Sequence, residues 1–320
     1  MSRMVFGNSN PERSYVLKKI FCLLVSIEVG YKVLRRKKMK FASFIYNNKN
    51  TWGIVKDGQL ISVDGAILKE LPTLRSAISQ EKLLEVGQDL AKKAGTVAVD
   101  QATFLPVITD PEKILCVGLN YHEHRLEGGH DEVGNPTIFV RFANAQIGHN
   151  VPMIKPKESD TLDFEAELAV IIGTAGRRIS EENAFSHIAG YSCYNDGSVR
   201  EFQRHTTQFT PGKNFMGTGG FGPWMVTPDE ITDLQNVTVE SRLNGEVMQH
   251  AKVSDMIFSI PRIISYISTF TELVPGDVIA TGTPGGVGSR RDPKVWMWPE
   301  DICEIDISQV GVLSNPIIEG

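Results

Sequence analysis

Residues 163–173, of sequence DFEAELAVIIG, constrain the fold more than any other segment of this chain. The segment is rich in branched apolar residues and ends at a glycine, a pattern typical of a β-strand. Successive strand side chains point to opposite faces, so we expect Glu165 and Glu167 to stand together on one face. Adjacent carboxylates repel each other unless a cation lies between them. The pair therefore indicates either a metal site or a solvated strand face, and the segment alone does not decide between these.

The composition is that of a globular protein with a large core. The chain has 320 residues, of which 41% are hydrophobic, so we expect one large domain and a smaller one. No basic face recurs along the body, so nucleic-acid binding is not expected. The cysteines have no metal-ligand or CxxC spacing, which predicts buried free thiols in a reducing, cytoplasmic compartment. They are Cys22, Cys116, Cys193 and Cys303.

Residues 1–38 form a basic extension that we expect to lie outside the fold. They hold nine of the 33 Lys and Arg residues but only two of the 38 Asp and Glu residues. An apolar run at residues 20–29 is too short to span a membrane, and no small-residue cleavage site follows it. A membrane anchor or secretory signal is therefore the weaker alternative.

Two domains are expected after this extension. Residues 39–105 read as a small N-terminal α+β domain, with an alternating β meander at 40–64 and a helical stretch at 74–93. Residues 106–320 begin with a strand at 113–118 and continue as strands and turns. A few helices are expected there, at residues 181–187, 197–207 and 254–269. This β-rich pattern argues against a doubly wound parallel sheet.

One glycine-rich segment imitates a nucleotide-binding motif. Residues 217–222, GTGGFG, match the pattern GxGxxG. No clear strand precedes them, and Pro223 and Trp224 stand where the helix of such a motif should begin. We therefore interpret the segment as a turn or loop.

A third carboxylate, Asp196, follows the glutamate pair by about thirty residues, in the sequence YNDGS. Taken alone, Asp196 is more often a helix N-cap. Three carboxylates with open positions for water and substrate suit Mg²⁺ or Mn²⁺ better than Zn²⁺. The three residues are therefore candidate metal ligands.

His124 and Glu127 are candidates for acid–base chemistry. Their spacing of three places them together on one turn of helix, and the glycines at 128 and 129 would end that helix. A histidine oriented by a carboxylate can accept a proton near neutral pH. An exposed ion pair is the alternative.

Several polar residues downstream are candidates for binding substrate. Lys213 lies between glycine and asparagine in PGKNF, and Gln203 shares a helical face with Arg200; solvated surface positions are the alternative for each. Residues 281–288, TGTPGGVG, could present backbone N–H groups and the Thr283 hydroxyl to a carboxylate or phosphate. That loop lacks a P-loop lysine, so nucleotide binding is unsupported.

The order of these motifs resembles that of the fumarylacetoacetate hydrolase superfamily. The resemblance covers nearly all of residues 113–318 and is most specific in FEAEL, MIFSIP and TGTP. It implies an α+β fold, with a β-rich mixed-sheet roll around a deep metal site, usually in a homodimer. Residues 39–105 look like the small N-terminal domain of bacterial members of the acylpyruvate hydrolase and 2-hydroxyhepta-2,4-diene-1,7-dioate isomerase kind.

The resemblance also implies a role for each candidate residue. The metal, Mg²⁺ or Mn²⁺, would be held by Glu165, Glu167 and Asp196. The catalytic residues would be His124 and Glu127, which activate water, with Lys213 and Gln203 stabilising an oxyanion. Arg200 and Thr283 would lie near the substrate carboxylate. Arg141 stands where the family often has lysine, and it predicts a different anionic or hydroxylated end of the substrate.

The leading hypothesis is a metal-dependent hydrolase that cleaves a carbon–carbon bond in an acylpyruvate-like 2,4-diketo acid, releasing a pyruvate-type enolate. The substrate would be a small anionic keto acid. The alternative in the same scaffold is a decarboxylase or isomerase acting on oxaloacetate, a 2-hydroxymuconate-type dienoate or a keto-deoxy sugar acid. A non-catalytic binding protein is a third possibility, which the set of candidate residues disfavours.

Overall fold

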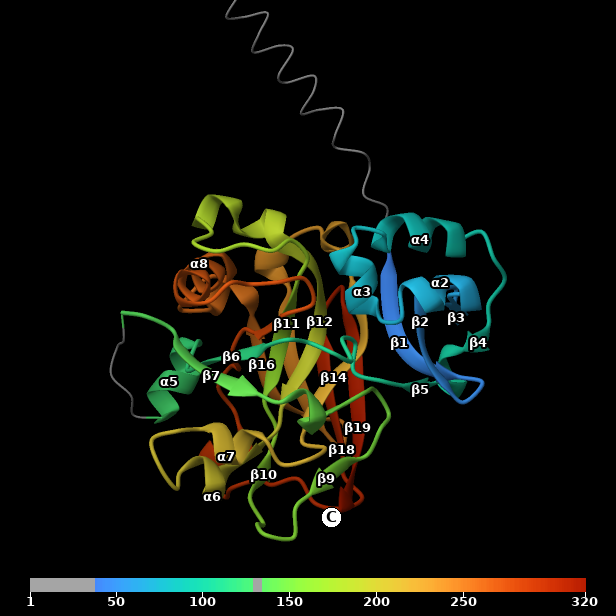
Figure 1. The fold of residues 1–320 in the computed structure, drawn as a ribbon. Helices are drawn as coiled ribbons and strands as arrows, with labels where there is room; N and C mark the ends of the chain where they lie inside the picture. The colour runs from blue at the N-terminus through green and yellow to red at the C-terminus, as the bar shows by residue number, and fades with distance from the viewer. Residues whose placement is uncertain (1–37, 129–133) are drawn as a thin grey trace, which may run out of the picture. The chain divides into compact units, whose positions relative to one another are not determined.

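A computed structural model describes residues 38–128 and 134–320, and residues 38–320 form one compact unit (Figure 1). The predicted basic extension, apart from Lys38, lies outside the described residues. None of the helices in the described part is long and apolar enough to cross a membrane. Cys116, Cys193 and Cys303 are buried free thiols, as predicted.

The N-terminal meander forms as the alternation predicts. Strands β1 (Lys40–Tyr46), β2 (Lys49–Lys56) and β3 (Gln59–Ser62) pair antiparallel in sequence order, followed by the short strands β4 (Val97–Ala98) and β5 (Thr103–Phe104). Helices α2 (Gly65–Glu70), α3 (Leu74–Ser79) and α4 (Leu83–Leu90) lie beside these strands (Figure 1). The predicted helix at 74–93 is thus two helices, because Glu81 between them adopts a left-handed φ of 58°.

The meander continues directly into the sheet that carries the site. The strand order is β4-β3-β2-β1-β14-β12-β11-β17-β6-β7. The later strands are β6 (Ile114–Gly118), β7 (Thr137–Arg141), β8 (Gln146–Ile147), β11 (Ala166–Ile172), β12 (Ile188–Asp196), β14 (Gly219–Val226) and β17 (Val278–Ala280). Among the described strands of this sheet most pairs are antiparallel, and the parallel pairs are β17 with β6 and β14 with β8. This mixed sheet confirms the α+β fold class and excludes a doubly wound architecture.

A second sheet packs against the first. It has the order β16-β15-β18-β19-β9, and its strands β18 and β19 contact β12 of the large sheet. Its members are β9 (Met153–Lys155), β15 (Thr238–Leu243), β16 (Glu246–Lys252), β18 (Ile302–Ile307) and β19 (Gly311–Glu319). A small separate pair joins β10 (Leu162–Asp163) to β13 (Ser198–Val199). The GxGxxG segment continues into strand β14. A nucleotide-binding motif would be followed by a helix at this point.

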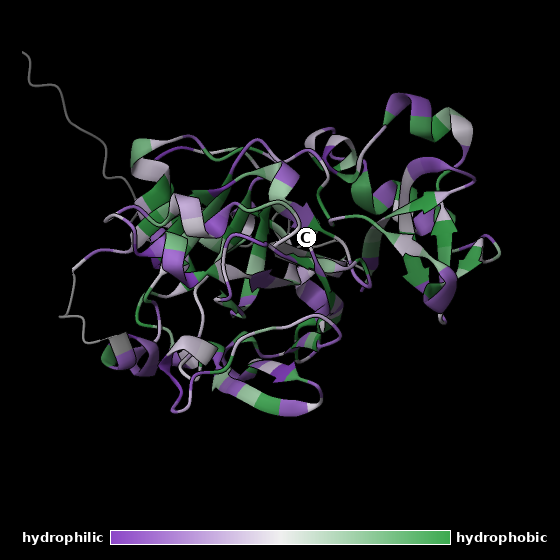
Figure 2. Cartoon of the chain, turned by 90° about the horizontal axis from the view of Figure 1, so that it is seen from below, coloured by the Kyte–Doolittle hydropathy of each residue, from purple (hydrophilic) through white to green (hydrophobic). Residues whose placement is uncertain are grey.

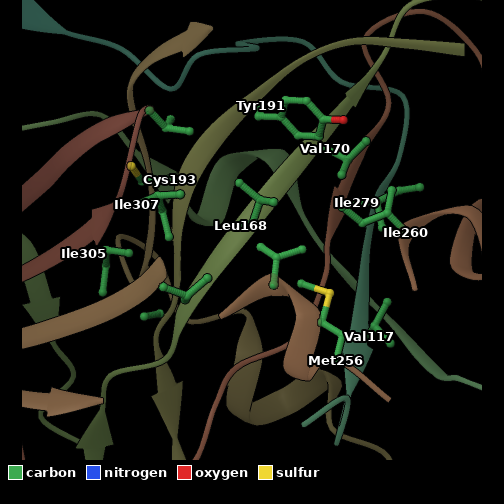
Figure 3. Packing of buried hydrophobic residues seen from close by; sticks show 14 of the residues in the cluster. Val117, Leu168, Val170, Tyr191, Cys193, Met256, Ile260, Ile279, Ile305 and Ile307 are labelled. Carbon is green, nitrogen blue, oxygen red and sulfur yellow. The ribbon is translucent and has the colours of Figure 1, made fainter. Parts of the chain in front are cut away.

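Strand β11 is buried on both faces, which excludes a solvated strand face. Leu168 and Val170 pack into the core between the two sheets, beside Tyr191, Cys193 and Ile279 (Figure 3). The residues that alternate with them, at 169 and 171, pack into a second core on the meander side. The strand begins at residue 166, three residues later than predicted, so Glu165 lies at its entrance and Glu167 within it.

The remaining helices lie outside the sheets, and together they carry both hydrophilic and hydrophobic residues (Figure 2). The segment predicted at 197–207 is helical only in α6 (Arg200–Gln203), and that at 254–269 begins later, as α8 (Ile260–Phe270). Helix α8 starts there because the Ser259 side chain accepts a hydrogen bond from the N–H of Arg262. The others are α5 (His122–Gly128), α7 (Thr210–Lys213) and the 3₁₀ helices η1 (Val99–Gln101), η2 (Ala143–Ala145), η3 (Glu181–His187), η4 (Pro228–Glu230), η5 (Leu234–Asn236), η6 (Val253–Asp255) and η7 (Gly288–Arg290).

Candidate active site

Three buried carboxylates meet where β11 and β12 lie side by side. Glu165 precedes β11, Glu167 belongs to it, and Asp196 ends β12. The antiparallel register places residue 166 opposite residue 195, and the N–H of Asp196 donates to the carbonyl of Glu165 at 3.0 Å. One carboxylate oxygen from each residue lies within 4.8 Å of the other two. The structure thus brings together the three residues that the sequence suggested as metal ligands.

Basic side chains neutralise two of these carboxylates. Lys213 Nζ lies 2.7 Å from Glu165 Oε2 and 2.7 Å from Asp196 Oδ2. Arg200 Nη1 lies 2.6 Å from Glu165 Oε1. Burial raises the pKa of Glu165, but the charges of Lys213 and Arg200 outweigh it and hold that pKa below its usual range. Burial lowers the pKa of Lys213, but Asp196 and Glu165 raise it overall, so this ammonium stays charged.

Glu167 differs from its two neighbours because no Lys or Arg nitrogen of residues 38–128 and 134–320 lies within 4.0 Å of it. Its carboxylate accepts one hydrogen bond, from the N–H of Gly282 at 2.9 Å. Burial, together with Asp196 and Glu165, raises its pKa well above the usual range. A buried carboxylate of this kind is costly unless a cation pairs with it. Three carboxylates, one of which has no basic side chain to balance its charge, fit a hard divalent cation such as Mg²⁺ or Mn²⁺.

Helix α5 places His124 and Glu127 at the same site. His124 Nδ1 lies 3.6 Å from Glu127 Oε2, an ion-pair separation that is too long for a hydrogen bond. The other oxygen of Glu127 accepts a hydrogen bond from the N–H of Gly286 at 2.9 Å. His124 is only 9% exposed and faces the same cavity as Glu165 and Glu167. The predicted dyad is therefore present, and Glu127 is held by the glycine-rich loop.

His124, Glu165 and Glu167 line a cavity of about 350 Å³, whereas Glu127 and Asp196 are not part of its wall. Arg200, Gln203, Lys213 and Thr283 also line it, so with His124 the structure places five of the predicted catalytic and substrate-binding residues on its wall. The Arg200 guanidinium donates to Asp163 and Gln203, and its Nη2 is buried without a hydrogen-bond partner. The wall consists of Val117, Gly118, Leu119, His124, Phe139, Glu165, Glu167, Arg200, Gln203, Arg204, Thr206, Phe209, Lys213, Thr283, Ser289 and Arg290.

Arg141 lies elsewhere than expected for a substrate-binding residue. Its Nη1 lies 2.5 Å from Asp196 Oδ1, its Nη2 donates to Thr218 Oγ1, and it is not part of the cavity wall. The side chain is 3% exposed and lies behind Asp196. It therefore orients a candidate metal ligand from behind the cavity wall, and a role for Arg141 in substrate binding stays a prediction.

The glycine-rich loop after β17 also differs from expectation, because its N–H groups bind the protein's own carboxylates. Gly282 donates to Glu167, Gly286 to Glu127, and Gly288 to Asp163 at 2.8 Å. Within this loop it is the Thr283 side chain that lies on the cavity wall. The loop thus acts as a scaffold that positions acidic side chains.

Two residues that were not among the candidates from sequence hold the site together. Asp163 is fully buried and accepts hydrogen bonds from Arg200 and from the N–H groups of Gly288 and Ser289. Gln249 accepts a hydrogen bond from the N–H of residue 166 at 3.0 Å and donates to Thr283 Oγ1 at 2.8 Å. Asp163 begins the acidic segment and could have been considered from its charge. Gln249 has no local signal, because its role depends on contacts across the two sheets.

The chain belongs to the fumarylacetoacetate hydrolase family. The family model described as "Fumarylacetoacetate (FAA) hydrolase C-terminal" matches residues 113–318. The chain is 39% identical over 218 residues to the mitochondrial oxaloacetate tautomerase of Xenopus laevis, covering 68% of each protein. It is 35% identical over 301 residues to oxaloacetate tautomerase YisK of Bacillus subtilis, covering 87% of this chain and 100% of that protein.

A solved structure confirms the fold independently. The fumarylacetoacetate hydrolase of Exiguobacterium antarcticum matches with a TM-score of 0.77 and 31% identity. The match covers 88% of this chain and 100% of that one. The family membership expected from the motifs is therefore confirmed.

Proposed function

We propose that this protein is a metal-dependent isomerase that interconverts the keto and enol forms of oxaloacetate or a closely similar 2-oxo acid. The similarity to two oxaloacetate tautomerases supports this reaction, which is of the isomerase class given above as the alternative to acylpyruvate hydrolysis. The observation that carries the proposal is that His124, Glu165 and Glu167 line one cavity, with a carboxylate oxygen of Asp196 within 4.8 Å of an oxygen of each glutamate.

Glu165, Glu167 and Asp196 would hold the metal, Mg²⁺ or Mn²⁺. When bound, such a cation polarises a 2-oxo group and stabilises the enolate charge that forms when a neighbouring proton leaves. Lys213 keeps Glu165 and Asp196 in place and adds positive charge beside them. The Nη2 of Arg200 is buried beside the cavity without a hydrogen-bond partner, and it would pair with the substrate's first carboxylate.

His124 is the residue placed to move the proton. In the keto-to-enol direction it takes the proton from C3, the C3–H electron pair becomes the C2–C3 double bond, and the carbonyl oxygen becomes the enol oxygen after gaining a proton. The reverse direction returns a proton to C3. Glu127, 3.6 Å away, stabilises the protonated imidazole that forms between these steps.

Hydrolysis of a carbon–carbon bond is the second candidate, and the His124–Glu127 pair is the observation that favours it. The same imidazole could take a proton from water, and Lys213 and Gln203 lie on the cavity wall where they could stabilise an oxyanion. Tautomerisation needs no attacking water, whereas hydrolysis does. The two reactions therefore leave different products.

The test is product analysis by NMR with Mg²⁺-loaded protein. Enol oxaloacetate and an acylpyruvate are each supplied to the wild type and to His124→Gln. We expect the wild type to convert the enol to the keto form with no gain in pyruvate over the protein-free control, and His124→Gln to be at least about a hundredfold slower. Conversion of the acylpyruvate to pyruvate and a carboxylic acid, with no effect on the oxaloacetate tautomers, would establish hydrolysis instead.

A further inference from the structure

Two arginines on the cavity wall have no assigned role. Arg204 and Arg290 both line the active-site cavity. Within residues 38–128 and 134–320, neither guanidinium has a carboxylate within 4.0 Å or a hydrogen-bond partner. The other cations of the site are paired: Arg141 with Asp196, Arg200 with Asp163 and Glu165, and Lys213 with Glu165 and Asp196.

The backbone places both arginines beside the cavity, at positions exposed to solvent. Arg204 follows α6 directly, so it lies one helical turn beyond Arg200 and on the same face. Arg290 ends η7. The buried carboxylate of Asp163 binds Arg200 Nε at 2.7 Å and the N–H of Ser289 at 2.9 Å. One anchor therefore holds both segments that carry the unpaired arginines.

The charges around Arg204 are consistent with this geometry. Partial burial and the charges of Arg200 and Arg290 lower the pKa of Arg204. Like charges gathered at the mouth of a cavity repel each other, and an anion between them would relieve this repulsion. A guanidinium binds carboxylates well because its parallel N–H groups match the two oxygens.

We infer that Arg204 and Arg290 form a distal carboxylate subsite, which selects a 2-oxo dicarboxylate over a 2-oxo monocarboxylate. The inference rests on the proposed function, because it assumes that the first carboxylate and the 2-oxo group occupy the inner part of the cavity. Gln203 and Thr283 then face the middle of the substrate, and the second carboxylate lies nearer the rim. Solvated surface arginines without a ligand are the competing explanation.

The test compares two stable ligands that differ only at the distal end. Malate carries a second carboxylate, whereas 2-hydroxybutanoate has a methyl group there. Binding of each to Mg²⁺-loaded protein is measured by titration calorimetry, for the wild type and for the double variant Arg204→Gln/Arg290→Gln. Arg177→Gln, an exposed arginine away from the cavity, is the matched control.

We expect the wild type to bind malate at least about tenfold more tightly than 2-hydroxybutanoate, since charge-assisted pairs contribute at this level. In the double variant the affinities for malate and 2-hydroxybutanoate should differ by less than about threefold. Arg177→Gln should keep the preference of the wild type for malate. Because the ratio is taken within each variant, a loss of folded protein does not affect it. Equal binding of both ligands by the wild type, no malate binding, or an unchanged ratio in the double variant would overturn the subsite.

Turnover of oxaloacetate on the same preparations separates the two proposals. A wild type that prefers malate but does not interconvert oxaloacetate tautomers would reject the proposed function and keep the subsite. Tautomerase activity with no preference for malate would keep the function and reject the subsite.

Discussion

Lys213 Nζ lies 2.7 Å from Asp196 Oδ2, in a pair with almost no exposure to solvent. The same ammonium lies 2.7 Å from Glu165 Oε2, so one side chain joins two of the three candidate metal ligands. Removing one partner of a buried pair leaves an unpaired charge, which costs about 3–5 kcal/mol. We therefore expect Lys213→Met to lower the free energy of unfolding by roughly this amount without metal, as measured by denaturant titration.

Added Mg²⁺ should restore part of that loss, because the cation would replace the missing positive charge. Lys157→Met changes an exposed lysine and should stay within about 0.5 kcal/mol of the wild type. A Lys213→Met protein as stable as this control would show that the ammonium does not hold the carboxylates.

Glu167→Gln should have opposite effects on stability and on metal binding. The wild-type carboxylate is buried without a cationic side chain, so a neutral amide of similar shape should keep or raise the stability of the metal-free protein. Loss of one ligand should weaken Mg²⁺ or Mn²⁺ binding by at least about tenfold, measured by calorimetry. Glu123→Gln, at an exposed position of α5, serves as the control. Unchanged metal affinity in Glu167→Gln would reject this residue as a ligand.

The backbone conformation at residue 282 requires glycine. Its φ is +107°, and a Cβ added there would lie 2.6 Å from Cβ of the buried Asn120. Gly282→Ala should therefore destabilise the protein by about 1–3 kcal/mol and disturb the hydrogen bond to Glu167. Gly65→Ala, where a Cβ meets nothing within 4 Å, should be neutral or slightly stabilising. Thermal unfolding of the two variants provides the comparison, and equal midpoints would contradict this account.

His149 should make stability depend on pH. Burial lowers the pKa of His149 to about 4, whereas the unfolded chain binds this proton near pH 6.5. Below pH 6.5 the unfolded state therefore carries more protons, so stability falls as the pH drops towards 4. The contribution between pH 7 and pH 5 is roughly 1–2 kcal/mol.

The matched variant is His149→Asn. In the wild type, His149 Nδ1 accepts a hydrogen bond from the N–H of Ser314 at 3.0 Å, and the side-chain oxygen of asparagine can accept the same hydrogen bond. Its free energy of unfolding should fall less between pH 7 and pH 5 than that of the wild type. His205→Asn, at an exposed histidine, should follow the wild type. Parallel curves for His149→Asn and the wild type would exclude His149 as the source.

The strands and the grouping of the candidate metal ligands were predictable from the sequence. The alternation in residues 40–62 specifies a meander, and the two glutamates in an apolar strand suggested a metal site once Asp196 and the other motifs were considered with them. Helix lengths were less predictable. A segment as short as residues 200–203 has only a weak intrinsic preference for the helical conformation. This helix, α6, contacts α7 and β13, so tertiary contacts influence its length.

The direction of long side chains was not predictable in the same way. Arg141 reaches behind Asp196 because β7 lies at the edge of the large sheet, a position that follows from strand order and not from neighbouring residues. Gln249 likewise joins the two sheets across more than eighty residues. Both depend on tertiary contacts that a pattern along the chain does not encode.

One rate measurement decides whether the three carboxylates support metal-dependent enolate chemistry. Freshly dissolved enol oxaloacetate is mixed with protein, and the loss of enol absorbance is followed with Mg²⁺ or with EDTA, against Mg²⁺ alone. We predict that the wild type accelerates ketonisation with Mg²⁺, and that EDTA or Glu167→Gln returns the rate to that of the protein-free control. Full acceleration in EDTA or in Glu167→Gln, or no acceleration by the Mg²⁺-loaded wild type, would show that these carboxylates do not support metal-dependent ketonisation.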